Sequence, residues 1–235
     1  MVHVPTGGLV EEDTTRARLV VAAVESFTSV GYEGVSVREI ERRAGVNRGL
    51  VAYHFGTKEE LWKEAVGWLM ARFHDEFERY RPVLADLSAI ERQRVLFTVY
   101  GRFSARYPAY FRLLMLEGTQ ETKRSRWLVD EHIRPFMEFF RRVAEQPSLG
   151  ESTEVAAVSH FLFISAAAGL FAMPALSRLL YGVDPEVDVV AERAIQAIAR
   201  LGMAADGLAT PPPISSDADG PSEHGSAHND PLHLT

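Results

Sequence analysis

The 235-residue sequence predicts an all-α protein of about nine helices, and three observations lead to this fold class. Apolar residues recur at helical spacing in each periodic segment, and no segment shows the alternation that is typical of a strand. Glycine, proline and helix-capping residues separate the segments. The composition, 46% hydrophobic and 24% charged, is that of a folded chain, and the lack of cysteine excludes disulfides and cysteine-based metal or catalytic sites.

Three short helices are predicted near the N-terminus. Apolar positions between 15 and 30 recur at helical spacing. The S-x-x-E pattern at 36–39 is a capping box, which predicts a second helix of about two turns. Gly45 supplies the turn that follows this helix. Asn47 is expected to cap a third short helix, which reaches about residue 55.

Longer helices are predicted over the rest of the chain. One is expected from 58 to 80, because Thr57 begins a second capping pattern and apolar residues follow at helical spacing. Its wide apolar stripe is typical of a helix that contacts different partners along its length, and Pro82 is expected to break it. The other periodic segments predict helices at about 88–107, 108–117, 121–146, 153–181 and 185–203.

Charge is distributed unevenly along the chain. The net charge is −7, which by itself argues against a nucleic-acid partner. Residues 14–58, however, contain seven Arg and Lys against four Glu, a balance of +3. A locally basic segment on an acidic body is typical of a DNA-contacting module attached to a larger domain.

The two short helices joined through Gly45 match the helix-turn-helix layout, in which the second helix enters the major groove. Arg48, on the outer, N-terminal side of that helix, could bind a guanine through two hydrogen bonds, and Gly49 allows the backbone to approach the DNA. Lys58 places a cation at a helix N-terminus, which is the positive end of the helix dipole and therefore repels it. A DNA phosphate bound there would offset this repulsion. The predicted DNA-binding residues are Ser36, Val37, Arg38, Asn47, Arg48, Gly49, Leu50, Tyr53, His54 and Lys58.

The segments VSVREI (35–40), RAGVNRG (43–49) and YHFGTKEEL (53–61) closely resemble the DNA-binding domain of the TetR family of bacterial repressors. The resemblance is strong over residues 16–69 and rests on helix number and length beyond them. It implies a homodimer on a palindromic operator in double-stranded DNA, an all-helical ligand-binding core and, usually, repression relieved by a small molecule.

The resemblance also implies roles for single residues. The positions matched by Ser36, Tyr53, His54 and Lys58 contact phosphates in the family, and those matched by Arg48 and Gly49 contact bases or backbone. Many members have an aromatic residue at the position of Ala52, and Tyr53 stands next to it here. Whether Tyr53 takes over that phosphate contact is left open.

Four regions follow from these motifs. We expect a flexible N-terminal arm at 1–13 and a helix-turn-helix domain at 14–58. A ligand-binding and dimerisation domain is expected at 59–205, with the helix 58–80 shared between the two domains. The tail at 206–235 has no Lys or Arg and is rich in Pro, Gly and Ser, which is typical of disorder.

The larger domain carries many aromatic residues, so a pocket among its helices is expected to be largely apolar. Small residues in the helix predicted at 153–181 would let it approach a second copy closely, with the helix at 185–203 beside it. The candidate pocket residues are Phe103, Phe111, Arg112, Met115, Trp127, His132, Phe136, Phe140, His160 and Phe163. The candidate dimer residues are Leu162, Ser165, Ala166, Gly169, Met173, Ala191, Ala194 and Ile198.

Two other classes of protein were weighed. A helical enzyme with a non-DNA-binding N-terminus is disfavoured, because His74 with Glu78 and the run 130–132 have no third partner at a known catalytic or metal spacing. A membrane-attached protein is also disfavoured, because the uncharged run 155–177 contains polar residues and a proline. No cofactor or metal is expected. Residues 1–13 do not form a signal peptide, so the expected location is the cytoplasm.

Overall fold

The computed structural model describes residues 15–143 and 153–204. The expected arm at 1–13 and tail at 206–235 lie outside the described residues. The fold is all-α, as predicted, and the described part of the chain contains no strand. Its helices are α1 (Thr15–Val30), α2 (Val37–Ala44), α3 (Leu50–Phe55), α4 (Lys58–Leu84), α5 (Ala89–Arg106), α6 (Pro108–Glu117), α7 (Lys123–Leu128), the π-helical turn η1 (Val129–Ile133), α8 (Arg134–Val143), α9 (Thr153–Ala172), α10 (Pro174–Tyr181) and α11 (Asp188–Ala204).

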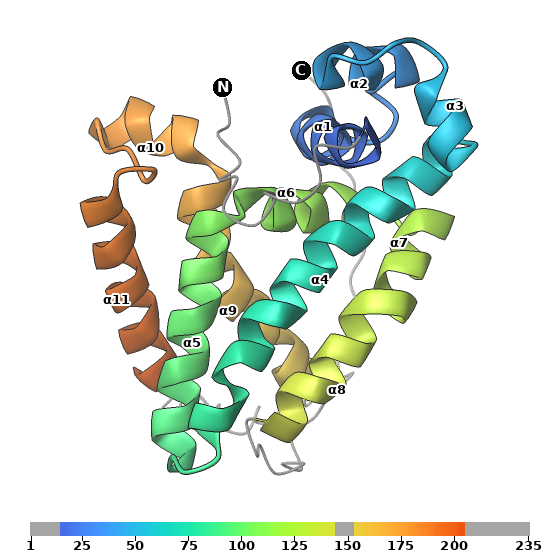
Figure 1. Ribbon diagram of the computed structural model, residues 1–235. Coiled ribbons are helices and arrows are strands. Elements are labelled where there is room, and N and C mark those ends of the chain that lie inside the picture. The colour runs from blue at the N-terminus through green and yellow to red at the C-terminus, as the bar shows by residue number, and fades with distance from the viewer. Residues whose placement is uncertain (1–14, 144–152, 205–235) are drawn as a thin grey trace, which may run out of the picture.

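Helices α1 to α3 form a unit at one end of the molecule, and α4 runs from this unit to the far end of the helical body (Figure 1). The first turns of α4 contact α1 and α3, and its later turns contact α5 and α8. Buried residues occur along α4 from Leu61 to Leu84. The prediction of two sets of partners for this helix is therefore confirmed.

The prediction that Pro82 ends the long helix is wrong, because α4 continues to Leu84. The fixed φ of proline fits a helix, but its missing N–H removes one hydrogen bond and its ring crowds the carbonyl one turn earlier. Pro82 lies two residues from the helix end, where this loss is confined to the last turn. Leu84 is buried, and its burial favours the extra turn.

Two predicted helices are interrupted. The segment expected at 121–146 contains η1, where the N–H of Arg134 donates to the carbonyl of Val129. The segment expected at 153–181 divides at Met173, because Pro174 begins α10 without an N–H of its own. Here α9 and α10 meet at a bend of 72°. These two interruptions account for eleven α-helical segments among the described residues where nine helices were expected.

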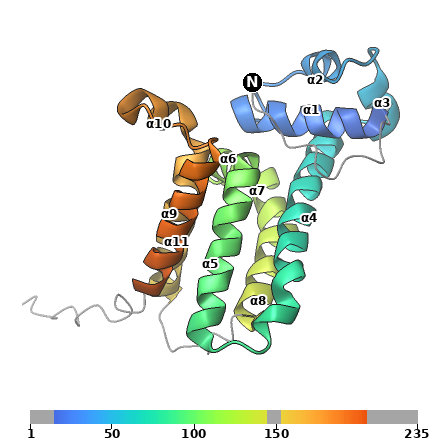
Figure 2. The same ribbon diagram turned by 60° about the vertical axis from the view of Figure 1, so that its left-hand side comes forward.

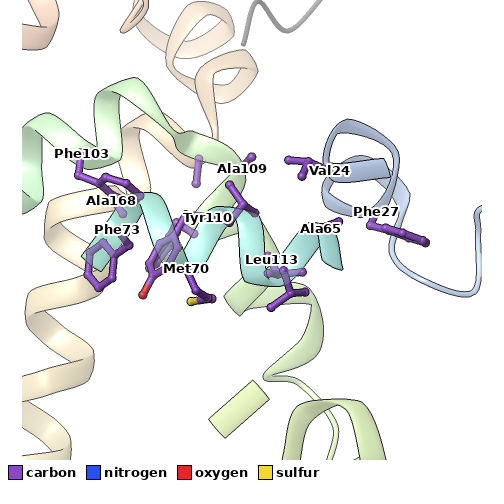
Figure 3. Close-up of a cluster of buried hydrophobic side chains, with 14 of the residues drawn as sticks. Val24, Phe27, Ala65, Met70, Phe73, Phe103, Ala109, Tyr110, Leu113 and Ala168 are labelled. Carbon is purple, nitrogen blue, oxygen red and sulfur yellow. The ribbon is translucent and has the colours of Figure 1, made fainter. Parts of the chain in front are cut away.

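The core of the helical body is made of interlocking aromatic rings. The Phe73 ring lies 4.4 Å from the ring of Tyr110, 4.3 Å from that of Phe136 and 4.8 Å from that of Phe103, measured between centroids. Figure 3 shows Phe73, Phe103 and Tyr110 close together, with Val24 and Phe27 of α1 at the other end of the same apolar cluster. A continuous core therefore joins the N-terminal unit to the body.

Membrane insertion was one alternative weighed for the run 155–177. Within the described residues, no single helix is long and apolar enough to cross a membrane. The bent pair formed by residues 160–172 and 174–181 passes this test of length and composition only when the two helices are taken together.

Candidate DNA-binding surface

The turn between α2 and α3 is held by the side chain of Arg18 from α1. Its Nη2 atom donates hydrogen bonds to the carbonyl oxygens of Ala44, at 2.6 Å, and Gly45, at 2.9 Å. Gly45 has a φ of 63°, which glycine adopts without strain, and a Cβ at this position would lie 2.8 Å from that Nη2 atom. Gly45 is therefore the turn residue that the sequence predicts, and Arg18 fixes its position.

The N-terminus of α2 shows half of the predicted capping box. The Ser36 hydroxyl accepts a hydrogen bond of 3.2 Å from the N–H of Glu39, as expected of a cap. The Glu39 carboxylate instead binds the guanidinium of Arg42, which lies one turn further along the same exposed face. This ion pair lowers the pKa of Glu39.

The cap of α3 differs from the prediction. Asn47 is exposed and lies outside the helix, whose N-cap residue is Gly49, which has no side chain to cap with. The Glu41 carboxylate takes this role: its Oε1 atom accepts hydrogen bonds from the N–H of Gly49, at 2.9 Å, and of Val51, at 3.1 Å. A full negative charge at the positive end of α3 is a stronger partner than an amide.

Glu41 is almost completely buried, with 3% of its surface exposed. It lies on the inner face of α2, four residues after Val37 and three before Ala44. A charged residue on an otherwise apolar helical face indicates a buried charge, and a buried charge needs a partner inside the fold. This was the signal in the sequence for Glu41. The sequence reasoning missed this residue.

The segment before α3 is exposed. Asn47, Arg48 and Gly49 all face solvent, and Leu50 is half-buried. Among the described residues, neither Arg48 nor Arg38 has an ion-pair or hydrogen-bond partner, whereas Arg42 is paired with a glutamate. The unpaired guanidiniums therefore lie at the start of α3 and in the first turn of α2.

Gly49 has a φ of 90°, in the left-handed region that side chains other than glycine rarely adopt. A Cβ at this position would meet no atom within 4 Å. The glycine is thus required by its backbone conformation, and the space above it is open. An open space beside an exposed arginine is suitable for the close approach of a large ligand surface.

Tyr53 and His54 lie one turn after the start of α3. The Tyr53 side chain is 80% exposed, and its ring packs edge-on against the His54 ring with 4.9 Å between centroids. Tyr53 therefore projects from the surface next to Ala52, which is itself exposed. This orientation is compatible with the phosphate contact that the sequence left open.

Lys58 begins α4, whose first turn is capped by the Thr57 hydroxyl through a 3.1 Å hydrogen bond from the N–H of Glu60. The Lys58 ammonium lies 4.2 Å from the centroid of the Tyr32 ring. Its pKa is lowered, chiefly because the ammonium is partly buried. Lys58 is thus half-buried, and its side chain is held by an aromatic ring.

The candidate pocket residues do not surround one open cavity. A tight apolar hollow without room for a water molecule lies between α1, α4 and α6, and none of the ten candidates lines it. Phe103 and Phe111 are buried, and the rings of Phe136, Phe140 and Phe163 pack against other rings of the core.

Two of the candidates are not placed as a pocket would require. Met115 is 46% exposed on the surface, because α6 turns this side away from the body. The Nε atom of Arg112 donates a 2.9 Å hydrogen bond to the carbonyl of Ala172, at the end of α9, so this guanidinium already has a structural partner. His160 packs against Phe161, and burial lowers its pKa.

Trp127 and His132 do lie together. The Trp127 ring is 5.5 Å from the ring of Trp62 and 5.0 Å from that of His132. The Nε1 atom of Trp62 and the Nε2 atom of His132 are buried and have no hydrogen-bond partner within the described structure. Burial lowers the pKa of His132.

The candidate dimer residues divide into two groups. Leu162, Ser165 and Ala166 form an exposed stripe on α9, and Met173 is exposed at its end, while Gly169 is half-buried. On α11, Ile198 is buried within its own protomer: its Cδ1 atom lies 3.5 Å from the point where a Cβ on Gly101 of α5 would stand. Ala191 and Ala194 are half-buried and pack against the same core, so they keep part of their surface for a partner, and their place in a dimer interface stays a prediction.

The residues considered for metal binding or acid–base chemistry, apart from the half-buried His132, lie at the surface. His74 is 3.8 Å from Glu78, and both side chains are partly exposed. Asp130 binds Arg134 at 3.1 Å on the surface. In residues 15–143 and 153–204, no group of three or more His, Asp or Glu side chains could hold a metal ion.

The helical fold and the geometry of α1 to α4 define a class: an all-α protein with an N-terminal helix-turn-helix unit. Residues 19–65 match the family described as bacterial regulatory proteins, tetR family. The resemblance to this family that was stated from the sequence is confirmed over these residues.

Two curated relatives are repressors. The chain is 28% identical over 111 residues to the HTH-type transcriptional repressor NicS of Pseudomonas putida. This match covers 47% of this chain and 51% of NicS. It is 27% identical over 128 residues to the HTH-type transcriptional repressor KstR2 of Mycobacterium tuberculosis, covering 49% and 64%. The match thus spans about half of this chain. The family and these relatives are transcriptional regulators and not enzymes.

Solved structures share the fold over most of the chain. The fatty acid degradation regulator FadR from Bacillus halodurans superimposes with a TM-score of 0.57 at 14% identity, over 82% of this chain and 96% of that one. FadR from Bacillus subtilis, in complex with stearoyl-CoA, gives a TM-score of 0.53 at 16% identity, over 78% and 97%. At these identities the likeness shows the fold alone.

Proposed function

We propose that the protein is a homodimeric transcriptional repressor that binds a palindromic operator and leaves it when a small, largely apolar ligand binds. The observation that carries this proposal is the start of α3. There a buried carboxylate fixes the helix, and an unpaired Arg48 stands next to the open backbone of Gly49. A guanidinium so placed can donate two parallel hydrogen bonds to the O6 and N7 atoms of a guanine.

Phosphate contacts would position this helix on the duplex. Ser36, Val37 and Arg38 at the start of α2 offer free N–H groups and an unpaired guanidinium. Further donors to phosphates would come from the residues that follow the start of α3, namely Tyr53 and His54 on α3 and Lys58 at the start of α4. Under this proposal residues 14–58 are the DNA-binding domain, and 59–205 the ligand-binding and dimerisation domain, with α4 shared by both.

The exposed stripe on α9 supports a dimer. Ala157, Val158, Phe161 and Leu162 are exposed, and the small residues Ser165 and Ala166 continue the stripe. Small residues allow two helix axes to approach closely, and a two-fold axis would bring the same stripe of both copies together. On the surface of the body, α9 lies beside α11 and away from α4 (Figure 2). Two α3 helices about 34 Å apart would then reach successive major grooves.

The aromatic core supports an apolar ligand. Its rings fill the space between α4, α5, α6 and α8, so a ligand that enters there must push rings apart and shift the helices that carry them. The unpartnered nitrogens of Trp62 and His132 offer polar contacts at the edge of this core. A fold shared with a regulator that binds stearoyl-CoA is compatible with this ligand class.

The proposal is tested by a footprint of the full-length protein on the DNA upstream of its own coding region. Two protected stretches, one helical turn apart and related by two-fold symmetry, would support it. A screen of small apolar acids and their thioesters for release of that DNA tests the ligand class. DNA binding occurs at the chromosome, so the cytoplasmic location is part of the same proposal. The proposal would be contradicted if the footprint shows no protected stretch even at protein concentrations that bind random DNA.

A further inference from the structure

Tyr32, in the turn that joins α1 to α2, is contacted by two cations from different parts of the chain. The Lys58 ammonium lies 4.2 Å from the centroid of its ring, and the central guanidinium carbon of Arg124 lies 4.0 Å from it. Lys58 begins α4 at the proposed DNA surface, whereas Arg124 belongs to α7 in the helical body. At this ring, therefore, the DNA surface meets the body.

Arg124 also binds two carboxylates. Its Nη1 atom is 3.2 Å from Oε1 of Glu33, beside Tyr32, and its Nε atom is 3.4 Å from Oε2 of Glu117, the last residue of α6. The Glu33 side chain is 82% exposed, whereas that of Glu117 is only 6% exposed. One guanidinium thus joins α7, α6 and the α1–α2 turn, and it neutralises a carboxylate of that turn.

Lys58 lies within the electrostatic reach of the same groups. The Glu33 carboxylate acts to raise the pKa of Lys58, and the Arg124 guanidinium acts to lower it, while burial has the largest effect and also lowers it. If Arg124 moved away, the Lys58 ammonium would still lie within electrostatic reach of Glu33. A carboxylate paired with this ammonium would compete with a DNA phosphate for it.

We propose that Arg124 is a positioning residue for DNA binding: by binding Glu33 and packing on Tyr32, it keeps the Lys58 ammonium available for a DNA phosphate. The inference rests on the proposed DNA-binding function and adds a route for its regulation. Trp127, one turn after Arg124, packs against Trp62 at the edge of the aromatic core. A ligand that shifts α7 there would withdraw Arg124, and Glu33 would then capture Lys58.

The test compares the DNA affinity of full-length variants on the footprinted fragment at several salt concentrations. R124Q is expected to bind about two- to fivefold more weakly, the range that exposed ion pairs contribute. Its plot of log affinity against log salt is expected to be shallower by about one phosphate contact. E33Q in the R124Q background is expected to restore both quantities, since no carboxylate then competes for Lys58. R124K, which keeps the charge, is expected to bind like the wild type.

A matched control lies on the same helix. Arg126 binds Glu121 at 2.9 Å on the exposed side of α7, away from Tyr32, and R126Q is expected to bind DNA like the wild type. Circular dichroism checks that each variant is folded. If R124Q is unfolded, the double variant R124Q/E117Q takes its place, because it no longer buries an unpaired carboxylate. The rescue is then measured in the triple variant R124Q/E117Q/E33Q.

Two results would overturn the inference while leaving the proposed function intact. One is that folded R124Q binds DNA with the affinity and salt dependence of the wild type. The other is that E33Q fails to rescue a weakened R124Q, which would assign the loss to a general distortion. Failure of the wild-type protein to bind any fragment would contradict the proposed function itself, and the inference with it.

Discussion

The carboxylate of Glu41 accepts a 2.9 Å hydrogen bond from the backbone N–H of Gly49, so a buried charge on α2 fixes the first residue before α3. The same oxygen accepts from the N–H of Val51, which satisfies two of the donors that a helix N-terminus leaves free. The helix proposed to read DNA has six residues, too few to be stable alone. Its orientation therefore depends on this carboxylate and on the packing of Val51.

Replacing Glu41 tests this dependence. E41A leaves two N–H groups at the start of α3 without a partner, and we expect it to lower the free energy of unfolding by about 1–3 kcal/mol. E41Q keeps one acceptor and is expected to lose less. Urea unfolding measures both, with E39A on the exposed face of the same helix as the control. If E41A were as stable as E39A, the carboxylate would have no structural role.

Arg48 is expected to carry base recognition. R48A should lose about 1–3 kcal/mol of preference for the operator over random DNA, because each bidentate contact to a guanine contributes that much discrimination. Gel-shift titrations on both kinds of DNA measure this preference. Arg42, which is paired with Glu39, provides the control: R42A is expected to leave the preference unchanged. Equal losses of R48A on both DNAs would argue for a phosphate contact instead.

Lys58 is expected to bind phosphate without regard to sequence. K58A should weaken binding to all DNAs alike, and the slope of log affinity against log salt should fall by about 0.9. A salt titration of the wild type and the variant measures the slope. K63A serves as the comparison, since Lys63 lies further along α4 and is paired with Glu60 at 2.9 Å. An unchanged slope for K58A would remove this contact from the account.

The α9 stripe is expected to hold the dimer together. A166D places a charge where two copies would approach most closely, and we expect it to give monomers that bind the operator poorly. Gel filtration and light scattering measure the mass. A71D, on the exposed side of α4 and away from α9, is the matched control and should remain dimeric. A dimer that persists in A166D would move the interface elsewhere on the surface.

Histidine burial predicts a dependence of stability on pH. Burial lowers the pKa of His132 and of His160 in the folded state, so protons bind more readily to the unfolded chain. The contribution of these residues is complete above the unfolded pKa of about 6.5 and is lost as the pH falls below it. H132Q is expected to flatten the fall of unfolding free energy on the acid side of that value. An equally steep fall in H132Q would show that His132 does not contribute.

The helices were predictable where local signals are complete. α1 and α6 have the predicted bounds, because periodic apolar residues, a terminal glycine and an initial proline mark them within the chain itself. The end of α4 was not predictable from Pro82 alone, because burial of Leu84 by tertiary packing outweighs the lost hydrogen bond. The bend at Met173 was missed, although Pro174 was its signal.

The candidate site was predictable in part for the same reason. The exposure of Arg48 and the turn at Gly45 follow from the local motif. The bond from Gly49 to Glu41 and the ion pair between Arg124 and Glu33 join residues that are 8 and 91 positions apart, and no local pattern specifies such pairs. Ile198, one of the α11 residues assigned to a dimer face, is buried against α5, and periodicity alone does not distinguish packing within the protomer from packing on a second copy.

The most direct test of the account is a methylation-interference experiment on the footprinted fragment with the wild-type protein and R48A. The account predicts that methylation of guanine N7 at one position in each half-site, with the half-sites about 10 base pairs apart, prevents wild-type binding. It also predicts that R48A becomes insensitive to these two methyl groups. Wild-type binding that no guanine methylation disturbs, or an R48A variant with the same pattern of interference as the wild type, would contradict it.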